Sequence, residues 1–252
     1  MTQIIPFTAA IILIVLERSR RLCFRPSPLF RRSLFTDLFY LLTGFVAGGS
    51  LAVSYVVHGS WWIGDTLHLP HLAEIKLPFW LLVILALIAL DVGNYLAHYL
   101  LHRFDLLWEV HKIHHSSLQL DSMATFRSHI LEQIFRRLLA PFLLILVGFP
   151  SEAVVMAGGV FIAWAIFTHS NLQINLEFLE PVFITPRLHR LHHVDDSSTK
   201  NFGTVFSFWD RIRGTLILTN LSDKVQFGNG EVNYPQSWHL QFIEPFRKLI
   251  KS

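Results

Sequence analysis

Long apolar runs limit the folds of this chain more than any other feature, because about twenty apolar residues suffice to cross a lipid bilayer as a helix. Such runs cover residues 3–16, 34–57, 78–101, 138–149 and 152–168. The second and third are long enough to span, and the first is marginal. The last two, separated by residues 148–151, predict a shallow or re-entrant hairpin. Hydrophobic residues make up 52% of the chain and charged residues 15%, which excludes an ordinary soluble domain.

The distribution of positive charge predicts how these runs are oriented. Twenty of the 21 Lys and Arg residues lie in 17–33, 102–137 and 170–252, and Lys76 alone lies in 58–77. The positive-inside rule therefore places the first three segments in the cytoplasm and 58–77 outside. The first run precedes its positive charges, which predicts an uncleaved anchor. We predict an all-α integral membrane protein with about three to five membrane helices or hairpins and a cytoplasmic, histidine-rich helical cap.

Three histidine clusters accompany these runs. The first in the chain has two histidines four residues apart, and the other two have the pattern His-x-x-His-His. Residues i, i+3 and i+4 share one face of a helix, which is the spacing of metal ligands. Two His-x-x-His-His matches are more than chance predicts for 14 histidines in 252 residues. The eight rings belong to His98, His102, His111, His114, His115, His189, His192 and His193.

Local signals predict how the clusters meet. Asp105 is a candidate N-cap for the helix that carries the motif at 111–115. Thr185, followed by Pro186, starts the helix that carries the motif at 189–193. The hairpin over 138–168 would return the chain to the same face. His129 and His169 are further candidate ligands, of which His169 is favoured.

Polar residues that could hydrogen-bond a metal-binding ring are predicted on the helix that carries His98 and His102. Asp91 and Asn94 share a helix face with His98, so either could hydrogen-bond a ligand ring. Asp91 could instead bond a neighbouring helix. The remaining histidines are not expected to bind metal: His58, His68 and His71 fall in the outer loop, and His239 lies in an amphipathic tail.

Other cofactors and partners are excluded by what the chain lacks. Cys23 is the single cysteine, so neither an intrachain disulfide nor an iron–sulfur or cysteine-zinc site can form. The basic residues, which raise the pI to about 9.2, are spread over loops beside apolar runs. That distribution suits anionic lipid headgroups rather than a nucleic acid. No G-x-G-x-x-G motif for a flavin or nicotinamide cofactor is present.

These motifs, in this order, resemble the fatty acid hydroxylase (sterol desaturase) superfamily of membrane di-iron enzymes. The resemblance runs from about residue 91 to 215 and adds to the histidine clusters several flanking motifs. Arg213 stands where the family usually has Phe, which affects local packing. The flanking motifs are Asp91 with Tyr95, Leu107 with Trp108, Arg127 with His129 and Glu132, His169 with Asn171, Asn201 with Gly203, and Trp209 with Asp210 and Arg211.

The resemblance implies an oxygen-activating centre of two iron ions, held by the eight clustered histidines with His169 added and His129 as a further candidate. Zinc could substitute, because imidazole suits several metals. Outer-shell groups would be Asp91, Asn94, Asn171, Asn201 and Asp210. The implied reaction is hydroxylation or desaturation of an unactivated C–H bond in a lipid or sterol-like substrate, with O2 and two external electrons.

The resemblance also divides the chain. Residues 1–77 would be N-terminal membrane anchor segments, 78–220 a fatty acid hydroxylase-like catalytic domain, and 221–252 a C-terminal cytoplasmic tail, all within one structural domain. The tail has helical spacing of apolar residues from Ser237 to Ile250, which suits either the membrane surface or packing on the core. Pro245 is expected to interrupt a long helix there.

Electrons would come from a separate donor, such as a reductase, a ferredoxin or a cytochrome b5-like protein. Arg211 and Arg213 are candidate contacts for it, although binding of lipid headgroups or structural carboxylates by these arginines is the favoured interpretation. Two other functions fit histidine clusters. One is a membrane electron carrier with bis-histidine haem, and the other is a zinc hydrolase or a metal-handling protein such as a transporter. The chain lacks the H-E-x-x-H motif of metalloproteases.

Overall fold

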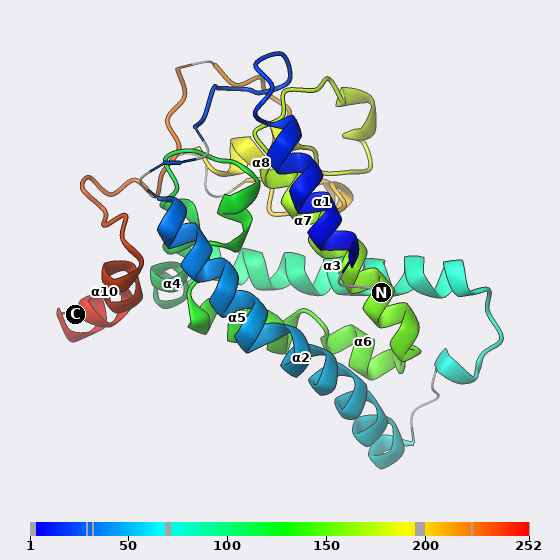
Figure 1. Cartoon of the computed structure of the whole chain (residues 1–252). Coiled ribbons are helices and arrows are strands. Elements are labelled where there is room, and N and C mark those ends of the chain that lie inside the picture. The colour runs from blue at the N-terminus through cyan, green and yellow to red at the C-terminus, as the bar shows by residue number, and fades with distance from the viewer. Residues whose placement is uncertain are drawn as a thin grey trace.

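The computed structural model describes residues 4–28, 30–31, 33–68, 72–194, 200–222 and 224–251. Within these ranges the regular structure is helical, and the three isolated β-bridges form no strand (Figure 1). The helices are α1 (Ile4–Leu16), α2 (Leu34–Leu67), α3 (Phe79–Arg103), α4 (Asp105–His115), α5 (Ile130–Leu139), α6 (Phe142–Val147), α7 (Ser151–His169), α8 (Pro186–His192), α9 (Phe208–Arg213) and α10 (Trp238–Lys251). Three short 3-10 turns are η1 (Leu72–Glu74), η2 (Ser122–Phe126) and η3 (Glu177–Leu179).

Two of these helices, α3 and α7, are long and apolar enough to cross a membrane. They pack against each other, and α1 lies along α7 (Figure 1). This arrangement confirms the expectation of a helical membrane-type protein. α7 has 19 residues and is longer than the apolar run at 152–168. The sequence predicts for this run only one half of a shallow hairpin.

The second apolar run forms a longer helix than expected. α2 continues to Leu67, so the first ten residues of the predicted outer loop, 58–67, are helical. The helix ends at His68, whose φ of 52° lies in the left-handed region that terminates helices. The non-helical part of the predicted outer loop therefore begins at His68 and not at residue 58.

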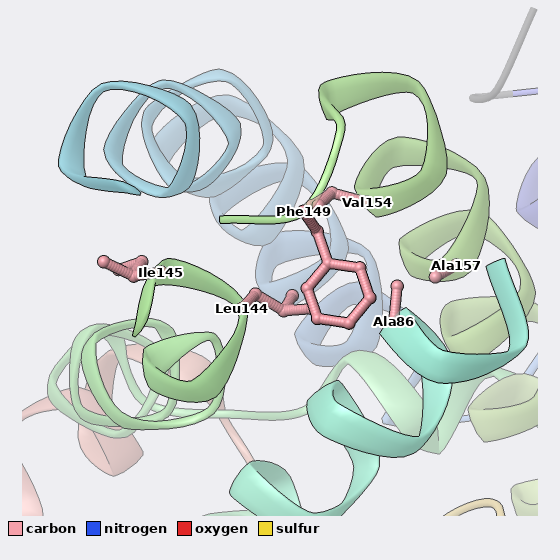
Figure 2. Close-up of a cluster of buried hydrophobic side chains, with 6 residues drawn as sticks. All are labelled: Ala86, Leu144, Ile145, Phe149, Val154 and Ala157. Carbon is pink, nitrogen blue, oxygen red and sulfur yellow. The ribbon is translucent and has the colours of Figure 1, made fainter. Parts of the chain in front are cut away.

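The chain turns between α6 and α7 at the residues where the sequence predicts a break. Gly148 adopts a left-handed φ of 65° at the end of α6, and Pro150 precedes the first residue of α7. Phe149, in this turn, is buried in the largest apolar cluster, with Leu144 of α6 and Ala86 of α3 (Figure 2). Ile145, Val154 and Ala157 complete the buried part of this cluster.

The histidine-bearing helices begin where local signals predicted, with one shift. Thr185 caps α8 by accepting a hydrogen bond from Leu188 N (3.4 Å), and Pro186 is the first helical residue. α4 follows α3 after Phe104. Phe104 occupies the cap position and Asp105 is the first residue of α4, so the prediction of Asp105 as N-cap is wrong by one position. An acidic residue in the first turn still favours the helix through its dipole.

The C-terminal helix packs on the histidine-bearing end of the molecule. α10 contacts α2 and α4, and lies with α4 at the same end of α3 (Figure 1). Trp238 stacks on Phe39 with ring centroids 4.2 Å apart, and the buried Gln241 donates to Ser116 Oγ (3.0 Å). The helix continues through Pro245 to Lys251, so the expected interruption does not occur. The tail therefore packs on the core, which is one of the two placements that its sequence suits.

Candidate metal centre

Nine histidines form two groups of converging rings. The first cluster comprises His98, His102, His111, His115 and His192, and the second cluster comprises His114, His169, His189 and His193. Within each cluster, the nearest ring nitrogens all lie within 4.8 Å of one another. These nine are the eight clustered histidines of the sequence together with His169, the favoured additional candidate.

Helix geometry divides the rings of α4 and α8 between the clusters. In α4, His111 and His115 are one turn apart and belong to the first cluster, whereas His114 belongs to the second. α8 and its C-cap use the opposite assignment, because the pair His189 and His193 belongs to the second cluster and His192 to the first. Each His-x-x-His-His motif thus serves both clusters, which places the clusters side by side.

The long apolar helices supply the remaining rings. His98 and His102 lie in the last turns of α3 and join the first cluster, and His169 is the last residue of α7 and joins the second. Both helices that could cross a membrane therefore end at this site.

The ring nitrogens of each cluster point at one another. In the first cluster, His98 Nε2 lies 3.1 Å from His111 Nε2 and 3.3 Å from His102 Nε2. In the second, His169 Nε2 lies 3.0 Å from His114 Nε2 and 2.9 Å from His189 Nε2. Two imidazole nitrogens bound to one metal at about 2.1 Å would lie about 3.0 Å apart in octahedral geometry and about 3.4 Å apart in tetrahedral geometry. The spacing fits a shared metal ion.

Hydrogen bonds to the other ring nitrogens show that several of these Nε2 atoms carry lone pairs. His98 Nδ1 donates to Phe202 O (2.8 Å), and a carbonyl oxygen can only accept. His114 Nδ1 donates to Arg127 O (3.1 Å), and His169 Nδ1 donates to Ala165 O (2.7 Å). In a neutral ring with Nδ1 protonated, Nε2 is the acceptor nitrogen. His114 and His169 therefore face each other with lone pairs 3.0 Å apart, which is repulsive unless a cation lies between them.

Burial keeps the rings in the form that binds metals. Removal from water lowers the pKa values of His114, His115, His189 and His193 well below the usual range, and neighbouring rings lower them further. Burial also lowers the pKa of His192 to about 3, although its bond to a backbone carbonyl opposes the shift. Neutral imidazole is the ligand form of histidine. Within the described part of the chain, His192 Nε2 and both nitrogens of His115 are buried without hydrogen-bond partners, so each ring has a nitrogen free to coordinate.

The loop after α8 supplies two of the carbonyls that orient rings. Phe202 O accepts from His98, and Lys200 O accepts from His192 Nδ1 (2.7 Å). Asp210 holds the loop by accepting from Phe202 N and Gly203 N, both at 2.8 Å. A Cβ on Gly203 would lie 2.6 Å from Phe206 O, so this turn requires glycine.

Three predicted outer-shell residues support this loop without contacting a ring. Asp91 accepts from Val205 N (3.0 Å), Phe206 N (3.1 Å) and Trp209 Nε1 (2.9 Å). A carboxylate that accepts from two loop N–H groups and from Trp209 of α9 is committed to these partners rather than to His98. Asn201, at φ 52°, bonds to Leu188 O and to both backbone groups of Ile217, and Asp210 acts as described above.

The two remaining asparagines bind elsewhere. Asn94 donates to Thr204 Oγ1 (2.9 Å) and accepts from Arg136 Nη1 (2.9 Å), so its link to a ring is indirect. Asn171 bonds to both backbone groups of Arg25 and fixes the segment after α1 next to the end of α7.

His129 lies outside both clusters. Its Nδ1 accepts from Leu131 N (3.2 Å), which caps α5, and its Nε2 bonds to Phe242 O of α10 (3.2 Å). His58, His68 and His239 are exposed and belong to neither cluster, in keeping with their exclusion, and His71 lies outside the described residues.

Glu132 belongs to the flanking motif with Arg127 and His129, but no role at the site is predicted for it from the sequence. Glu132 is buried in α5, and its Oε1 accepts from His111 Nδ1 (2.8 Å) and from Arg136 Nε (2.9 Å). The available signal was an acidic residue four positions before an arginine on a short helix. That pattern is usual on solvated faces and did not single out this pair.

A buried ion network holds Arg127, the residue whose carbonyl oxygen accepts from His114. Arg127 Nη2 lies 2.5 Å from Asp37 Oδ1, and Arg31 pairs with both Asp37 and Asp121. All four side chains are at most 5% exposed. Breaking such a pair leaves an uncompensated buried charge, so this network resists local movement of residue 127.

One side of the first cluster approaches the surface. Of the nine rings, only His102 is partly exposed, and Trp108 lies against it with ring centroids 5.1 Å apart. The guanidinium of Arg213 lies 3.7 Å from the ring centroid of Tyr99, one turn before Arg103 on α3. This cation–π contact gives Arg213 a packing role at the position where the family usually has Phe. Arg103, Arg211 and Arg213 are all exposed.

Comparisons with known proteins agree with this geometry. A family model described as fatty acid hydroxylase matches residues 83–215, which include all nine clustered histidines. Ornithine lipid hydroxylase OlsE of Rhizobium tropici is 35% identical over 135 residues, covering 53% of this chain and 41% of that protein. Alkylglycerol monooxygenase of Danio rerio is 27% identical over 162 residues, covering 63% of this chain and 35% of that protein.

Methylsterol monooxygenase 1 of Gallus gallus is 27% identical over 175 residues, covering 64% of this chain and 55% of that protein. The matches thus span about a third to about half of these relatives' lengths. No solved structure matches the chain significantly. Because the family model covers more than half of the chain and includes every residue of both clusters, this protein belongs to the fatty acid hydroxylase family.

Proposed function

We propose that this protein is a membrane-bound oxidoreductase that uses O2 and two external electrons to hydroxylate, or to desaturate, an unactivated C–H bond of a lipid or sterol-like substrate. The observation that carries the proposal is the pair of histidine clusters, whose Nε2 lone pairs converge inside the region that matches the family. The relatives' names, which refer to an ornithine lipid, an alkylglycerol and a methylsterol, support a lipid substrate.

Two iron ions would occupy the clusters, one held by the five rings of the first and the other by the four rings of the second. Imidazole suits iron, zinc and copper alike, so the family membership, rather than the ligand set, argues for iron, and zinc could bind the same nitrogens. When bound, the iron pair would supply the activation of O2 and the removal of hydrogen from the substrate.

The chain itself would hold the rings neutral, orient them and exclude water. Burial disfavours protonation, and the carbonyls of Ala165, Arg127, Lys200 and Phe202 fix which ring nitrogen carries the proton. Eight of the nine rings are buried, so a reacting centre there would be shielded from bulk water.

The proposed position is the cytoplasmic boundary of the membrane. His102 lies one residue before the end of α3 and His169 ends α7, and most Lys and Arg residues lie in 102–137 and 170–252, which carry most of the clustered histidines. A site at the ends of spanning helices suits a substrate whose reacting carbon enters from the bilayer. The division into anchor segments (1–77), catalytic domain (78–220) and tail (221–252) belongs to the same proposal, with α10 of the tail packed on α4.

A separate donor, which could be a reductase, a ferredoxin or a cytochrome b5-like protein, would supply the electrons. The partly exposed His102 favours electron entry at the first cluster, beside the exposed Arg211 and Arg213. Binding of lipid headgroups is the competing role for these arginines. The double variant Arg211→Glu/Arg213→Glu would separate the roles, because donor docking predicts a loss of turnover with the native donor, while turnover with a chemical reductant is retained. Unchanged turnover with the donor would refute docking at these arginines.

The geometry argues against the haem carrier. Five nitrogens within 4.8 Å of one another leave no room for a porphyrin plane between two axial ligands. A Soret band in the purified protein would overturn this argument. Metal release or flux without oxygen consumption would instead favour a hydrolase or transporter.

Lipid mass spectrometry tests the proposed activity directly. The native host lacking this gene would be complemented with wild type or with His192→Ala, which removes a first-cluster ring while leaving the second cluster complete. We expect a lipid that gains one oxygen, or loses two hydrogens, only with wild type. Identical lipid profiles at equal protein levels, with O2 and reductant present, would refute the proposed reaction.

A further inference from the structure

The two clusters differ in the groups that hold their outer ring nitrogens. Four rings, His98, His114, His169 and His192, donate from Nδ1 to backbone carbonyls. A fifth, His111 of the first cluster, donates instead to a carboxylate, Glu132 Oε1. Among the described residues, no ring of the second cluster is hydrogen-bonded to a carboxylate, and His189 Nδ1 is buried without a partner.

Glu132 is held in place by contacts that reach two other segments. Arg136, one turn later on α5, donates from Nε to Glu132 Oε1 and from Nη1 to Asn94 Oδ1 of α3. Asn94 in turn donates to Thr204 Oγ1, two residues after the carbonyl that orients His98. The carboxylate is buried beside the Arg136 guanidinium, so water screens its interaction with His111 only weakly.

We propose that Glu132 is a positioning residue that strengthens metal binding at the first cluster and so makes the two metal positions unequal. A carboxylate acceptor fixes the proton on His111 Nδ1 and makes Nε2 a stronger electron donor to a metal than a carbonyl acceptor would. Loss of such an outer group typically costs about 10- to 100-fold in metal affinity. The proposal rests on the proposed metal binding by the nine rings.

The competing explanation for unequal sites is the number of rings, five against four. A difference between the two positions in the wild type would therefore not test Glu132. The test requires removing the carboxylate while each cluster is assayed alone. Glu132→Gln keeps the shape of the side chain and an acceptor oxygen but removes the charge.

Two background variants isolate the clusters. His169→Ala/His193→Ala impairs the second cluster and leaves all five rings of the first, and His98→Ala/His102→Ala impairs the first and leaves all four rings of the second. Metal-free protein in detergent would be titrated with Co²⁺ against a competing chelator, with and without Glu132→Gln. We expect Glu132→Gln to weaken Co²⁺ binding by about 10- to 100-fold in the first background and by less than about threefold in the second. An equal loss in both backgrounds, or no loss in the first, would overturn the proposal.

A second buried carboxylate supplies the control for structural damage. Glu17 is fully buried and accepts from Ser122 and Asn171, without contacting a ring. Glu17→Gln should change thermal stability without a cluster-dependent change in Co²⁺ affinity. The outcomes also distinguish the two proposals. If the wild type binds no Co²⁺ at either cluster, the proposed metal centre fails, whereas intact binding that Glu132→Gln leaves unchanged refutes this inference alone.

Discussion

His114 and His115 are neighbours in the chain, yet their rings belong to different clusters. His114 Nε2 lies 3.0 Å from His169 Nε2 in the second cluster, whereas the ring of His115 packs 4.9 Å from that of His102 in the first. Successive helical residues point about 100° apart, so one helix can serve two metal positions. This relationship explains why adjacent histidine pairs occur in the chain.

Pairs of substitutions should therefore follow cluster membership and not sequence distance. His114→Ala/His169→Ala removes two rings from the second cluster, so we expect the first to keep its metal, about one ion per chain. His115→Ala/His169→Ala removes one ring from each cluster and leaves four and three, so both positions should retain metal and the content should exceed that of the first pair. Metal per chain, measured by mass spectrometry after dialysis, checks this. Equal metal content in the two double variants would contradict the assignment.

The close packing of α3 on the end of α5 gives a stability prediction. A Cβ on Gly93 would overlap the backbone carbonyl of Ala140, which cannot move as a side chain can. We expect Gly93→Ala to cost about 1–3 kcal/mol through overpacking. Gly158→Ala on α7 is the matched control, because nothing lies within 4 Å of the added methyl group, and alanine should stabilise the helix by about 0.5–1 kcal/mol.

Thermal unfolding of the detergent-solubilised protein compares the two variants. The predicted order of melting temperature is Gly158→Ala at or above wild type, and Gly93→Ala below it. A Gly93→Ala protein as stable as wild type would show that α3 and Ala140 are not in this contact.

The N-cap of α8 provides a test close to the second cluster. Thr185 Oγ1 accepts from Leu188 N, and the helix it begins carries His189 and His192. Thr185→Ala should lower stability by about 1 kcal/mol and loosen both rings, whereas Thr185→Ser keeps the capping oxygen. We expect the alanine variant to lose bound metal faster to a chelator than either the serine variant or wild type. Equal loss rates for the two variants would contradict a role for the cap.

The histidines were predictable from the sequence because helical spacing is local. His98 and His102, or His111 and His115, are one turn apart whatever the rest of the fold does. The assignment of rings to clusters was not predictable, since it depends on how α4 and α8 face each other across 70 residues of chain. For the same reason the role of Glu132 was not predictable, because its contact with His111 joins two helices whose relative rotation no local pattern encodes.

Two polar residues have partners that spacing alone does not predict. Asp91 shares a helix face with His98, but the loop after α8 offers it two backbone donors and Trp209 of α9 a third, and a buried carboxylate is stabilised by satisfying them. His129 lies in a segment of the family motif, but its ring caps α5 and bonds α10. Sequence spacing identifies which residues share a helix face but not which other residues contact that face in the fold.

Removal of metal should destabilise the protein more than the loss of any one hydrogen bond. Without a cation, the lone pairs of His98 and His111, and of His114 and His169, face each other at 3.1 and 3.0 Å in a buried site. A ligand that binds only the folded state stabilises it by about 2.7 kcal/mol at 100 times its Kd, and two such sites contribute separately. We expect the melting temperature to fall on chelation and to recover in two steps as Co²⁺ is added, one for each cluster. His192→Ala, which lacks a first-cluster ring, should weaken one step and leave the other. A melting temperature insensitive to chelator, in protein shown to contain metal beforehand, would mean that the rings do not hold it.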